Sequence, residues 1–263
     1  MAGDGEADWS EDHLLGGRVR LRQPRDGYRA AIDPVLLAAA VEAKPGAVVL
    51  DAGLGAGAVA LCLLARRPDL RLIGIESDPA TAAIARVNAA ANDVADRLDV
   101  RCGTLETVAM AMTDAGESVD GVVTNPPYLS AAAADASPTP GRQRSNVESV
   151  ALSTWIAACA RPLRMKGVLT LIHRADRLDD VILALHRAGC AEVAVLPLWP
   201  RADVEARRVL VRGRKGIAGP ARLLPGLVLH QADGRFTAAA EAILRDGTAL
   251  GWKGSTLPQD SPS

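Results

Sequence analysis

A short motif, Asn125-Pro126-Pro127-Tyr128, follows an apolar run at residues 119–124. The run predicts a buried parallel strand, so the motif would lie at the carboxyl end of that strand, where open α/β sheets bind ligands. Asn125 offers an amide carbonyl, and the two prolines stiffen the backbone and leave carbonyls free to accept. Tyr128 offers a flat face for stacking. The motif suits a planar ring that carries an exocyclic –NH₂ group; a plain strand-ending turn is the alternative.

A second candidate site lies upstream, where a strand predicted at residues 47–52 runs into a glycine-rich loop and then a helix to about residue 66. The loop contains Gly53, Gly55 and Gly57. Glycine lets the backbone approach a ligand closely, and the N-terminus of the helix lies beside that ligand. Strand, glycine loop and helix in this order predict a nucleotide-binding turn.

The acidic residues around this loop indicate the kind of nucleotide. Glu76 ends the next predicted strand, at residues 71–76, and is suited to accept from both ribose hydroxyls. The dinucleotide fingerprint wants a third glycine where Ala58 stands, which weakens an NAD interpretation without removing it. Asp51, which opens an Asp-x-Gly-x-Gly-x-Gly pattern, favours a nucleoside without pyrophosphate, such as S-adenosylmethionine.

The elements that must hold these two sites alternate along the chain, which predicts an α/β fold with a mostly parallel sheet of seven strands and helices on both faces. Besides those already named, strands are predicted at 98–101, 167–173, 191–198 and 206–212, with another short apolar stretch at 223–229. Helices are predicted at 34–43, 79–92, 105–118, 148–164, 177–188 and 237–245.

The flanks differ from this core. Residues 1–12 are polar and acidic and predict a disordered tail, and residues 251–263 predict a flexible one. Between them, 13–250 predict a single domain, which starts with a strand and helix extension over 13–45. In that extension Asp33 is expected either to cap the helix or to act at the ligand. An Ala-, Ser- and Pro-rich segment at 130–147 predicts a mobile functional loop, or else a polar linker.

The composition indicates a cytoplasmic protein. With 263 residues, 49% of them apolar, the chain can bury a large core. No run of eighteen uncharged apolar residues is present, and the acidic start does not resemble a signal peptide. We therefore expect no membrane span. The four cysteines are scattered without metal-ligand spacing, so we also expect no metal site.

Basic residues are unevenly distributed although the net charge is −1. Residues 13–29 contain five arginines and one acid, and residues 201–222 contain seven basic residues and two acids. Arginine outnumbers lysine 26 to 4, which suits contacts with phosphates and bases, although GC-rich coding produces the same bias. The patches favour RNA or another polyanion, with solvated surface as the alternative.

With these residues placed, the chain resembles the class I S-adenosylmethionine-dependent methyltransferases of the small-domain type, which have a Rossmann-like fold. More narrowly, it resembles the bacterial family that methylates the exocyclic amine of an adenine beside the anticodon of valine tRNA. The resemblance covers roughly residues 14–247. Its motifs are Gln23-Pro24 with Gly27-Tyr28-Arg29 and Asp33, the loop from Asp51 to Gly57, Glu76, Asn125 to Tyr128, and Arg208 to Lys215.

The resemblance implies a role for each motif residue. Asp51 would organise the glycine loop around S-adenosylmethionine, Glu76 would hold the ribose, and Asn125 with the Pro126 carbonyl would bind the target amine while Tyr128 stacks on the base. One departure is Thr104, which stands where many relatives carry an acid that binds the cofactor's adenine; Thr104 can still accept a hydrogen bond. The residues expected to bind the tRNA substrate are Tyr28, Arg29, Arg207, Arg208 and Lys215.

Other acceptors share the same chemistry. A glutamine methyltransferase acting on release factors uses the same tetrapeptide, but those enzymes carry a helical domain before the glycine loop, whereas fifty residues precede Asp51 here. Methylation of a guanine amine in ribosomal RNA is a further option, and DNA adenine methylation is less favoured. A non-catalytic RNA-binding scaffold is the alternative outside enzymes, against which the intact motifs argue.

Overall fold

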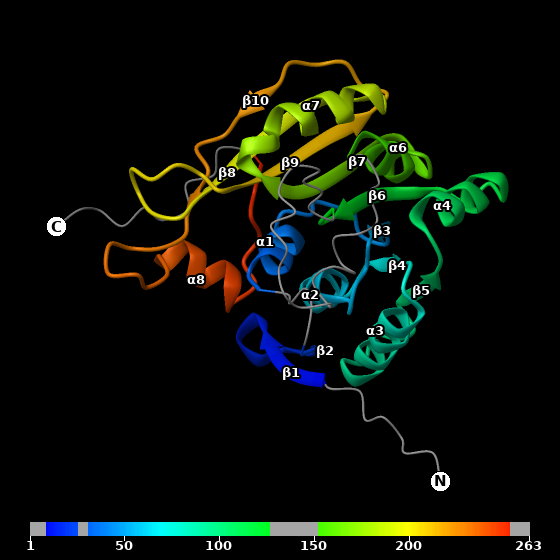
Figure 1. Ribbon diagram of the computed structural model, residues 1–263, viewed down its shortest axis with the longest axis horizontal. Coiled ribbons are helices and arrows are strands. Elements are labelled where there is room, and N and C mark those ends of the chain that lie inside the picture. The colour runs from blue at the N-terminus through cyan, green and yellow to red at the C-terminus, as the bar shows by residue number, and fades with distance from the viewer. Residues whose placement is uncertain (1–8, 26–30, 127–151, 253–263) are drawn as a thin grey trace, which may run out of the picture.

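The strands predicted between residues 47 and 212 form one sheet in the computed structural model, which describes residues 9–25, 31–126 and 152–252 (Figure 1). Their apolar runs are buried on both faces, as is typical of parallel strands. The seven long strands are β3 (Val48–Ala52), β4 (Arg71–Glu76), β5 (Leu98–Cys102), β6 (Val119–Thr124), β7 (Leu163–Arg174), β8 (Cys190–Trp199) and β9 (Arg208–Lys215).

The strand order is β10-β8-β9-β7-β6-β3-β4-β5, with β11 also paired to β8. Strand β9 runs antiparallel to β7 and β8, while the other pairs in this sheet are parallel among the described residues. The prediction of a mostly parallel sheet is confirmed, but in the part of the chain that the structure describes the sheet has nine strands instead of the predicted seven. The apolar stretch at 223–229 contributes two further two-residue strands, β10 (Arg222–Leu223) and β11 (Leu227–Val228).

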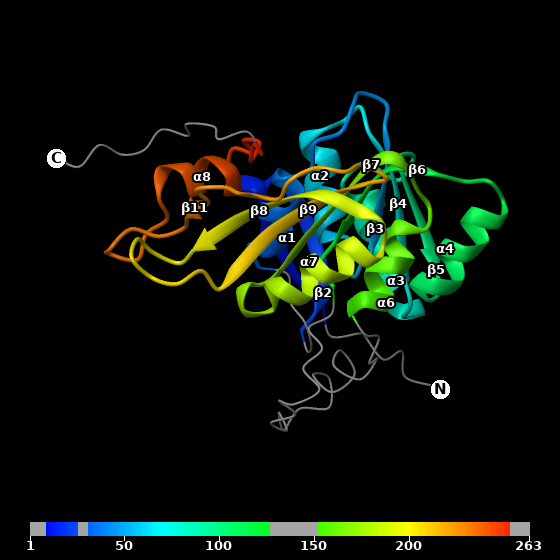
Figure 2. The same ribbon diagram turned by 90° about the horizontal axis from the view of Figure 1, so that it is seen from above.

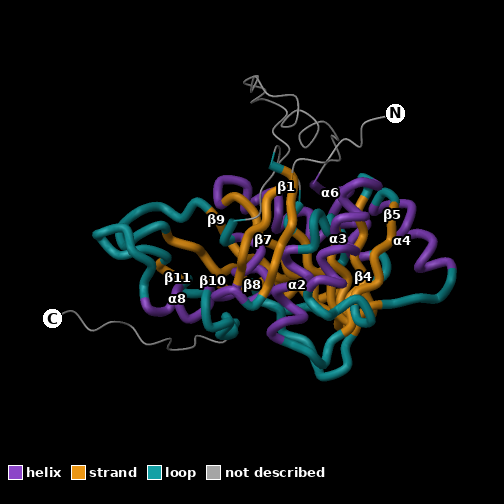
Figure 3. The backbone as a smooth tube through the Cα atoms, turned by 90° about the horizontal axis from the view of Figure 1, so that it is seen from below, coloured by secondary structure: helices purple, strands orange, loops and turns teal. Residues whose placement is uncertain are grey.

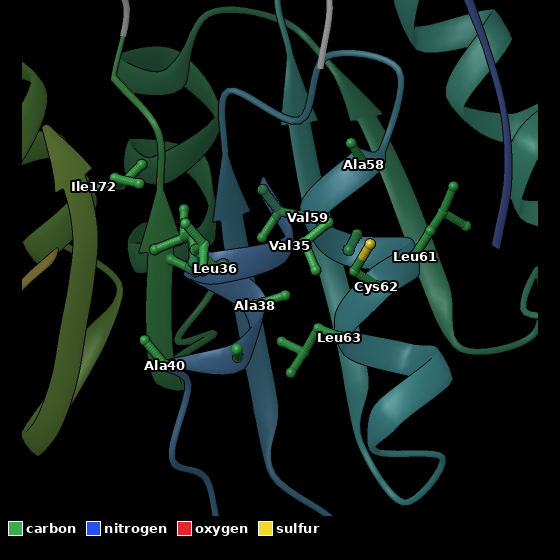
Figure 4. Packing of buried hydrophobic residues seen from close by; sticks show 14 of the residues in the cluster. Val35, Leu36, Ala38, Ala40, Ala58, Val59, Leu61, Cys62, Leu63 and Ile172 are labelled. Atoms are coloured by element: carbon green, nitrogen blue, oxygen red, sulfur yellow. The ribbon is translucent and has the colours of Figure 1, made fainter. Parts of the chain in front are cut away.

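Helices cover both faces of the sheet, because successive strand residues point to opposite sides. Val49 belongs to one core and Leu50 to the other. In Figure 4, side chains of the first two helices meet with Ile172 of β7 in the first of these cores. Its helices are α1 (Asp33–Ala39), α2 (Ala58–Arg66), α3 (Pro79–Ala91) and α8 (Ala238–Leu244). The opposite face carries α4 (Leu105–Asp114), α6 (Leu152–Ala160) and α7 (Leu178–Arg187), the last preceded by the short 3₁₀ helix η2 (Ala175–Arg177).

Helices α3, α4 and α8 begin at a side chain that caps them, whereas α1, α2 and α7 have no side-chain hydrogen bond at the N-cap within the described ranges. The Asp78 carboxylate accepts from the Thr81 N–H at 2.9 Å, and Pro79 occupies the first turn of α3. Helix α1 instead has Ile32 at its N-cap, so the prediction of Asp33 as the capping residue is wrong. The Asp33 carboxylate faces β9, where the Arg208 guanidinium lies 3.3 Å away.

The N-terminal region begins with a hairpin. Strand β1 (Trp9–Leu14) pairs antiparallel with β2 (Val19–Pro24) across the 3₁₀ helix η1 (Leu15–Gly17). The hairpin packs against α2 and α3, as Figures 1 and 3 show. The prediction of a disordered tail through residue 12 is therefore wrong from residue 9 onward, because the acidic segment gains a partner strand ten residues further along the chain.

The C-terminal part of the chain is anchored through Trp252. Its side chain is fully buried, and its Nε1 donates to the Ala40 carbonyl at 2.7 Å. The Arg212 guanidinium stacks over the indole, 4.7 Å from the ring centroid. The prediction of a flexible tail is therefore wrong for residue 252, because an indole that can bury its ring and satisfy its N–H stabilises a fixed position. In Figure 2, α8 and α4 mark opposite ends of the molecule.

Candidate functional site

The two motifs meet at the carboxyl edge of the sheet. Strand β3 lies between β4 and β6, and Ala52 at its end pairs with both Ile75 and Thr124. The glycine loop follows β3 directly, Glu76 is the last residue of β4, and Asn125 follows β6. A donor site on the glycine loop and an acceptor site at Asn125 are thus neighbours, as in-line transfer between two ligands requires.

The glycine loop is held against β4 by backbone hydrogen bonds. The N–H groups of Gly53 and Leu54 both donate to the Ile75 carbonyl, at 3.1 and 2.8 Å. The backbone φ angles of Gly53, Gly55 and Gly57 are +79°, +57° and +95°, which residues other than glycine rarely adopt. A Cβ at Gly55 would meet no described atom within 4 Å, so this part of the loop faces open space where a ligand can lie.

The Glu76 side chain is oriented by backbone N–H groups, one of them in the glycine loop. One carboxylate oxygen accepts from the Gly55 N–H at 2.8 Å, and the other accepts from the Asp78 N–H at 2.9 Å. A carboxylate has about four lone-pair sites, so two backbone bonds leave capacity for ribose hydroxyls. The half-buried Glu76 therefore fits the role that the sequence predicts for it.

Asp51 is a buried carboxyl group with an unfilled hydrogen-bonding site. Its side chain is 1% exposed, and Oδ2 has no hydrogen-bond partner among the described residues. Burial raises the pKa of this carboxyl well above its usual value, and the negative charge of Glu76 adds to the rise, while a hydrogen bond from the Ala60 backbone opposes it. An unsatisfied acceptor beneath the glycine loop fits a cationic or hydrogen-bond-donating ligand such as S-adenosylmethionine.

Asn125 is positioned by the residue before it. The amide oxygen of Asn125 is buried, and Pro126 after it is buried as well. The hydroxyl of Thr124 donates to the Ala52 carbonyl at 2.8 Å, which ties the end of β6 to the end of β3. The same hydroxyl oxygen accepts from Trp155 Nε1 at 3.0 Å.

Trp155 contacts both halves of the site, although sequence reasoning gave it no function. Besides its bond to Thr124, its indole lies 3.1 Å from where a Cβ on Gly53 would stand. Gly53 is thus required both by its backbone angle and by the indole beside it. A lone tryptophan in an Ala-rich helix that follows the Asn125 motif was the available signal in the sequence.

Thr104 follows β5 and starts α4. Its hydroxyl accepts from the Thr107 N–H at 3.3 Å and contacts the Thr107 hydroxyl at 2.9 Å, so it is already engaged as a helix cap. A hydroxyl oxygen has a second lone pair, and the prediction that Thr104 also accepts from the cofactor stays a prediction.

The basic residues of β9 separate into two groups. Arg207 is exposed, and Arg208 lies beside Asp33 near the carboxyl edge, because Arg208 pairs with Arg174 at the end of β7. Lys215 lies at the other end of β9, where its ammonium donates to the carbonyls of Ala160, Arg161 and Leu163 at 2.6, 3.2 and 2.7 Å. Lys215 thus caps the C-terminal end of α6 on the opposite edge, away from Asn125, and its role as a substrate contact stays a prediction.

Several predicted features fall outside the described residues: Tyr28, Arg29, Pro127, Tyr128 and the loop at 130–147. Within the described part of the chain, no group of three or more His, Cys, Asp and Glu side chains is arranged to hold a metal ion. In the same part, every helix is too short or too polar to cross a membrane.

The chain is similar to known methyltransferases in sequence. A family model for the methyltransferase small domain matches residues 31–184. The tRNA1(Val) (adenine(37)-N6)-methyltransferase of Porphyromonas gingivalis is 31% identical over 234 residues, which cover 84% of this chain and 88% of the relative. The release factor glutamine methyltransferase of Cereibacter sphaeroides is 34% identical over 213 residues, 77% of this chain and 72% of the relative.

A solved structure shares the fold. The crystal structure of a predicted O-methyltransferase from Agrobacterium tumefaciens superimposes with a TM-score of 0.67 at 24% identity. The match covers 83% of this chain and 98% of that chain. The two proteins therefore share their overall fold.

Proposed function

This chain belongs to the methyltransferase small domain family, and from that premise we propose that it transfers a methyl group from S-adenosylmethionine to the N6 amine of an adenine in tRNA. The proposed target is the adenine at position 37 of valine tRNA, which the name of the Porphyromonas gingivalis relative specifies for that protein. The observation that carries the proposal is Asn125 at the end of β6, next to the glycine loop at the end of β3.

The residues of the loop fit the cofactor. S-adenosylmethionine supplies a methyl group on a positively charged sulfonium. Gly53, Gly55 and Gly57 would let it approach the backbone, Glu76 would accept from its ribose, and Asp51 would offer the buried oxygen that lacks a partner among the described residues. We propose these five residues as the donor site.

The acceptor site would act on the amine itself. The lone pair of an adenine amine is delocalised into the ring, so the amine is a poor nucleophile. Hydrogen bonds from its two N–H groups to the Asn125 side chain and the Pro126 carbonyl would favour a pyramidal nitrogen and free the lone pair. The proposed role of Tyr128 is to stack on the base, which must leave its own stack, at lowest cost in a loop.

The nearest acid in sequence is not placed to act as a base. Asp120 lies at the start of β6, four strand positions from its end, where its Oδ2 accepts from the Val48 N–H at 2.7 Å and its other oxygen pairs with Arg164. No strong base is required by this chemistry, because the methylated amine is acidic until it loses a proton. The proposed mechanism therefore rests on positioning and on hydrogen bonds.

A glutamine side chain of a release factor is the second candidate acceptor, since a carboxamide is also planar with an –NH₂ group. The similarity to the Cereibacter sphaeroides relative favours it. The β1–β2 hairpin that precedes the sheet supports RNA instead, because the glutamine enzymes resemble one another in having a helical domain in that place.

The test presents both acceptors to the same enzyme. Tritium transfer from labelled S-adenosylmethionine is measured with a valine tRNA anticodon stem-loop, with the same stem-loop carrying guanine at position 37, and with a release factor. We expect transfer to the adenine stem-loop alone, and nucleoside analysis should show N6-methyladenosine. Preferred transfer to the release factor would establish the second candidate and end the tRNA proposal.

A further inference from the structure

Asn88 is a buried polar residue in the middle of α3 that faces two other elements. Its side chain is 1% exposed. The Oδ1 atom accepts from the Arg22 N–H at 2.9 Å, and Nδ2 donates to the Arg22 carbonyl at 2.8 Å. The same Nδ2 donates to the Ala56 carbonyl, inside the glycine loop, at 2.9 Å. One amide thus holds the outer edge of β2 and the glycine loop together.

Asn92, the residue at the C-cap of α3, lies four residues after Asn88 and bonds the hairpin in the same way. Its Oδ1 accepts from the Arg20 N–H at 2.9 Å, and its Nδ2 donates to the Arg20 carbonyl at 2.7 Å. The remaining bond of Nδ2 goes to the Asn88 carbonyl within α3, at 2.8 Å. Residues four apart share a helix face, so the two asparagines lie side by side along β2. Their amides bond the backbone groups that a neighbouring strand would otherwise bond. Asn88 differs from Asn92 in its bond to the glycine loop.

That bond is made to the residue between two glycines of the loop. Ala56 stands between Gly55 and Gly57, and glycine loses more conformational entropy on ordering than any other residue. A buried amide that uses both of its N–H groups restricts such a segment, whereas loss of the bond would leave the Ala56 carbonyl without this donor. The three hydrogen-bond partners of the Asn88 side chain are all backbone groups, so they cannot rotate away as side chains can.

We propose that Asn88 is a positioning residue for cofactor binding and that the β1–β2 hairpin, through Asn88, is a structural part of the cofactor site. The proposal rests on the assignment of the glycine loop to S-adenosylmethionine made above. Hairpin, α3 and loop then act as one unit: when the hairpin is docked, the Ala56 carbonyl is bound and the loop keeps the shape that accepts the ligand. Asn125, which follows β6, lies outside this unit.

The experiment compares Asn88→Ala with Asn92→Ala in the full chain. Both variants lose two bonds to the hairpin, but Asn88→Ala alone also releases the glycine loop. We expect S-adenosylmethionine, titrated by calorimetry, to bind Asn88→Ala on the order of 5- to 10-fold more weakly, as the loss of about one buried hydrogen bond implies, and to bind Asn92→Ala nearly as it binds the wild type. In turnover, Asn88→Ala should raise KM for the cofactor and leave kcat at saturating cofactor close to that of the wild type.

Hydrogen exchange supplies a readout that a loss of global stability does not produce. In Asn88→Ala the amides of Gly55 and Gly57 should exchange faster than in Asn92→Ala at matched temperature below unfolding. Should Asn88→Ala fail to fold, Asn88→Ser keeps a small polar group that is too short to join Arg22 to the Ala56 carbonyl, and it should show the same weaker binding.

The outcomes distinguish the role of Asn88 from the assignment of the glycine loop to S-adenosylmethionine. Equal cofactor affinity in the two alanine variants, with wild-type binding intact, would overturn the role of Asn88 and leave the assignment of the loop standing. A wild-type protein that does not bind S-adenosylmethionine would remove the assignment itself, and the proposal for Asn88 with it.

Discussion

Asp51 illustrates how one residue can be unfavourable for stability and useful for binding. A carboxyl group that is fully buried, beside a second acid and with one oxygen lacking a partner among the described residues, favours its neutral form. The same oxygen can accept from a ligand donor or face a positive charge, and either would draw the group toward its charged form. The unfavourable burial of the Asp51 carboxyl group is thus consistent with a role in ligand binding.

Asp51→Asn should make the free protein more stable at neutral pH. Because burial raises the pKa of Asp51, the folded state binds the proton more tightly than the unfolded state, so stability from this group is present below the unfolded pKa of about 3.9 and is lost as pH rises through the folded pKa. The amide does not titrate. In thermal melts the variant should be more stable than the wild type above the folded pKa, and the difference should be small near pH 4. Its affinity for the cofactor should fall. A variant less stable than the wild type at neutral pH would contradict this.

Asn125→Ala should separate chemistry from cofactor binding. Removing the acceptor for the target amine should lower single-turnover methyl transfer on the order of 10²- to 10³-fold, by analogy with the loss of one positioned hydrogen bond elsewhere. Affinity for S-adenosylmethionine should stay near that of the wild type. Gly55→Val gives the opposite pattern, since a branched side chain at φ +57° strains the loop and fills the ligand's space. If Asn125→Ala lost cofactor affinity as severely, the division of the two sites would be wrong.

At the scale of elements, α6 connects the acceptor strand to the donor loop through Trp155. Its indole N–H bonds the Thr124 hydroxyl, which bonds the end of β3, and the ring lies beside Gly53. A shift of α6 would therefore move both ligands relative to each other. Small displacements of this kind reduce transfer because the reacting atoms must be aligned.

Trp155→Phe should keep most of the packing and lose the bond to Thr124. We expect a loss of about 1 kcal/mol in the free energy of unfolding and a lower rate of single-turnover transfer at saturating cofactor. Trp199→Phe is the matched control, because Trp199 Nε1 donates to the Pro225 carbonyl at 3.0 Å and Trp199 lies on β8, away from the glycine loop. A similar loss of rate in both variants would show a general effect of stability.

The sequence predicted the sheet well because its strands are buried on both faces and read as apolar runs such as residues 119–124. It did not predict β1, since Trp9–Leu14 is mostly polar and becomes a strand through pairing with β2. Nor could it predict the roles of Asn88 and Asn92, which depend on a hairpin some seventy residues earlier in the chain. Local patterns reveal an element, while its partners come from tertiary structure.

The sequence predicts the candidate site from motifs that follow strand ends, and the structure brings Gly53–Gly57 and Asn125 to adjacent strand ends. Lys215 lies apart from them for a geometric reason. Arg208 and Lys215 stand at the two ends of β9, and seven residue steps along a strand span roughly 24 Å. A cluster of basic residues in the sequence is therefore divided between opposite edges of the sheet.

The whole molecule has almost no net charge, so RNA affinity must come from local placement. Arg201 and Arg207 are exposed in the connection from β8 to β9, which lies at the carboxyl edge beside the end of β7. Neither forms an ion pair with an acid in the described part of the chain. Arg212 and Arg214 are paired with Glu42 and Glu192, at 2.6 and 2.9 Å, and are less available to phosphates.

Replacing both Arg201 and Arg207 with Ala should weaken RNA binding and its dependence on salt. Each phosphate contact contributes about 0.7 to 0.9 to the slope of log affinity against log salt, because neutralising a phosphate releases a counterion. Two lost contacts should reduce the slope magnitude by about 1.4 to 1.8. Arg161→Ala is the control, since Arg161 is equally exposed but lies at the opposite edge, after the end of α6. Binding is measured by fluorescence anisotropy of the anticodon stem-loop across a salt series. A slope that falls for Arg161→Ala and stays constant for the double variant would place the RNA on the other edge, away from Asn125.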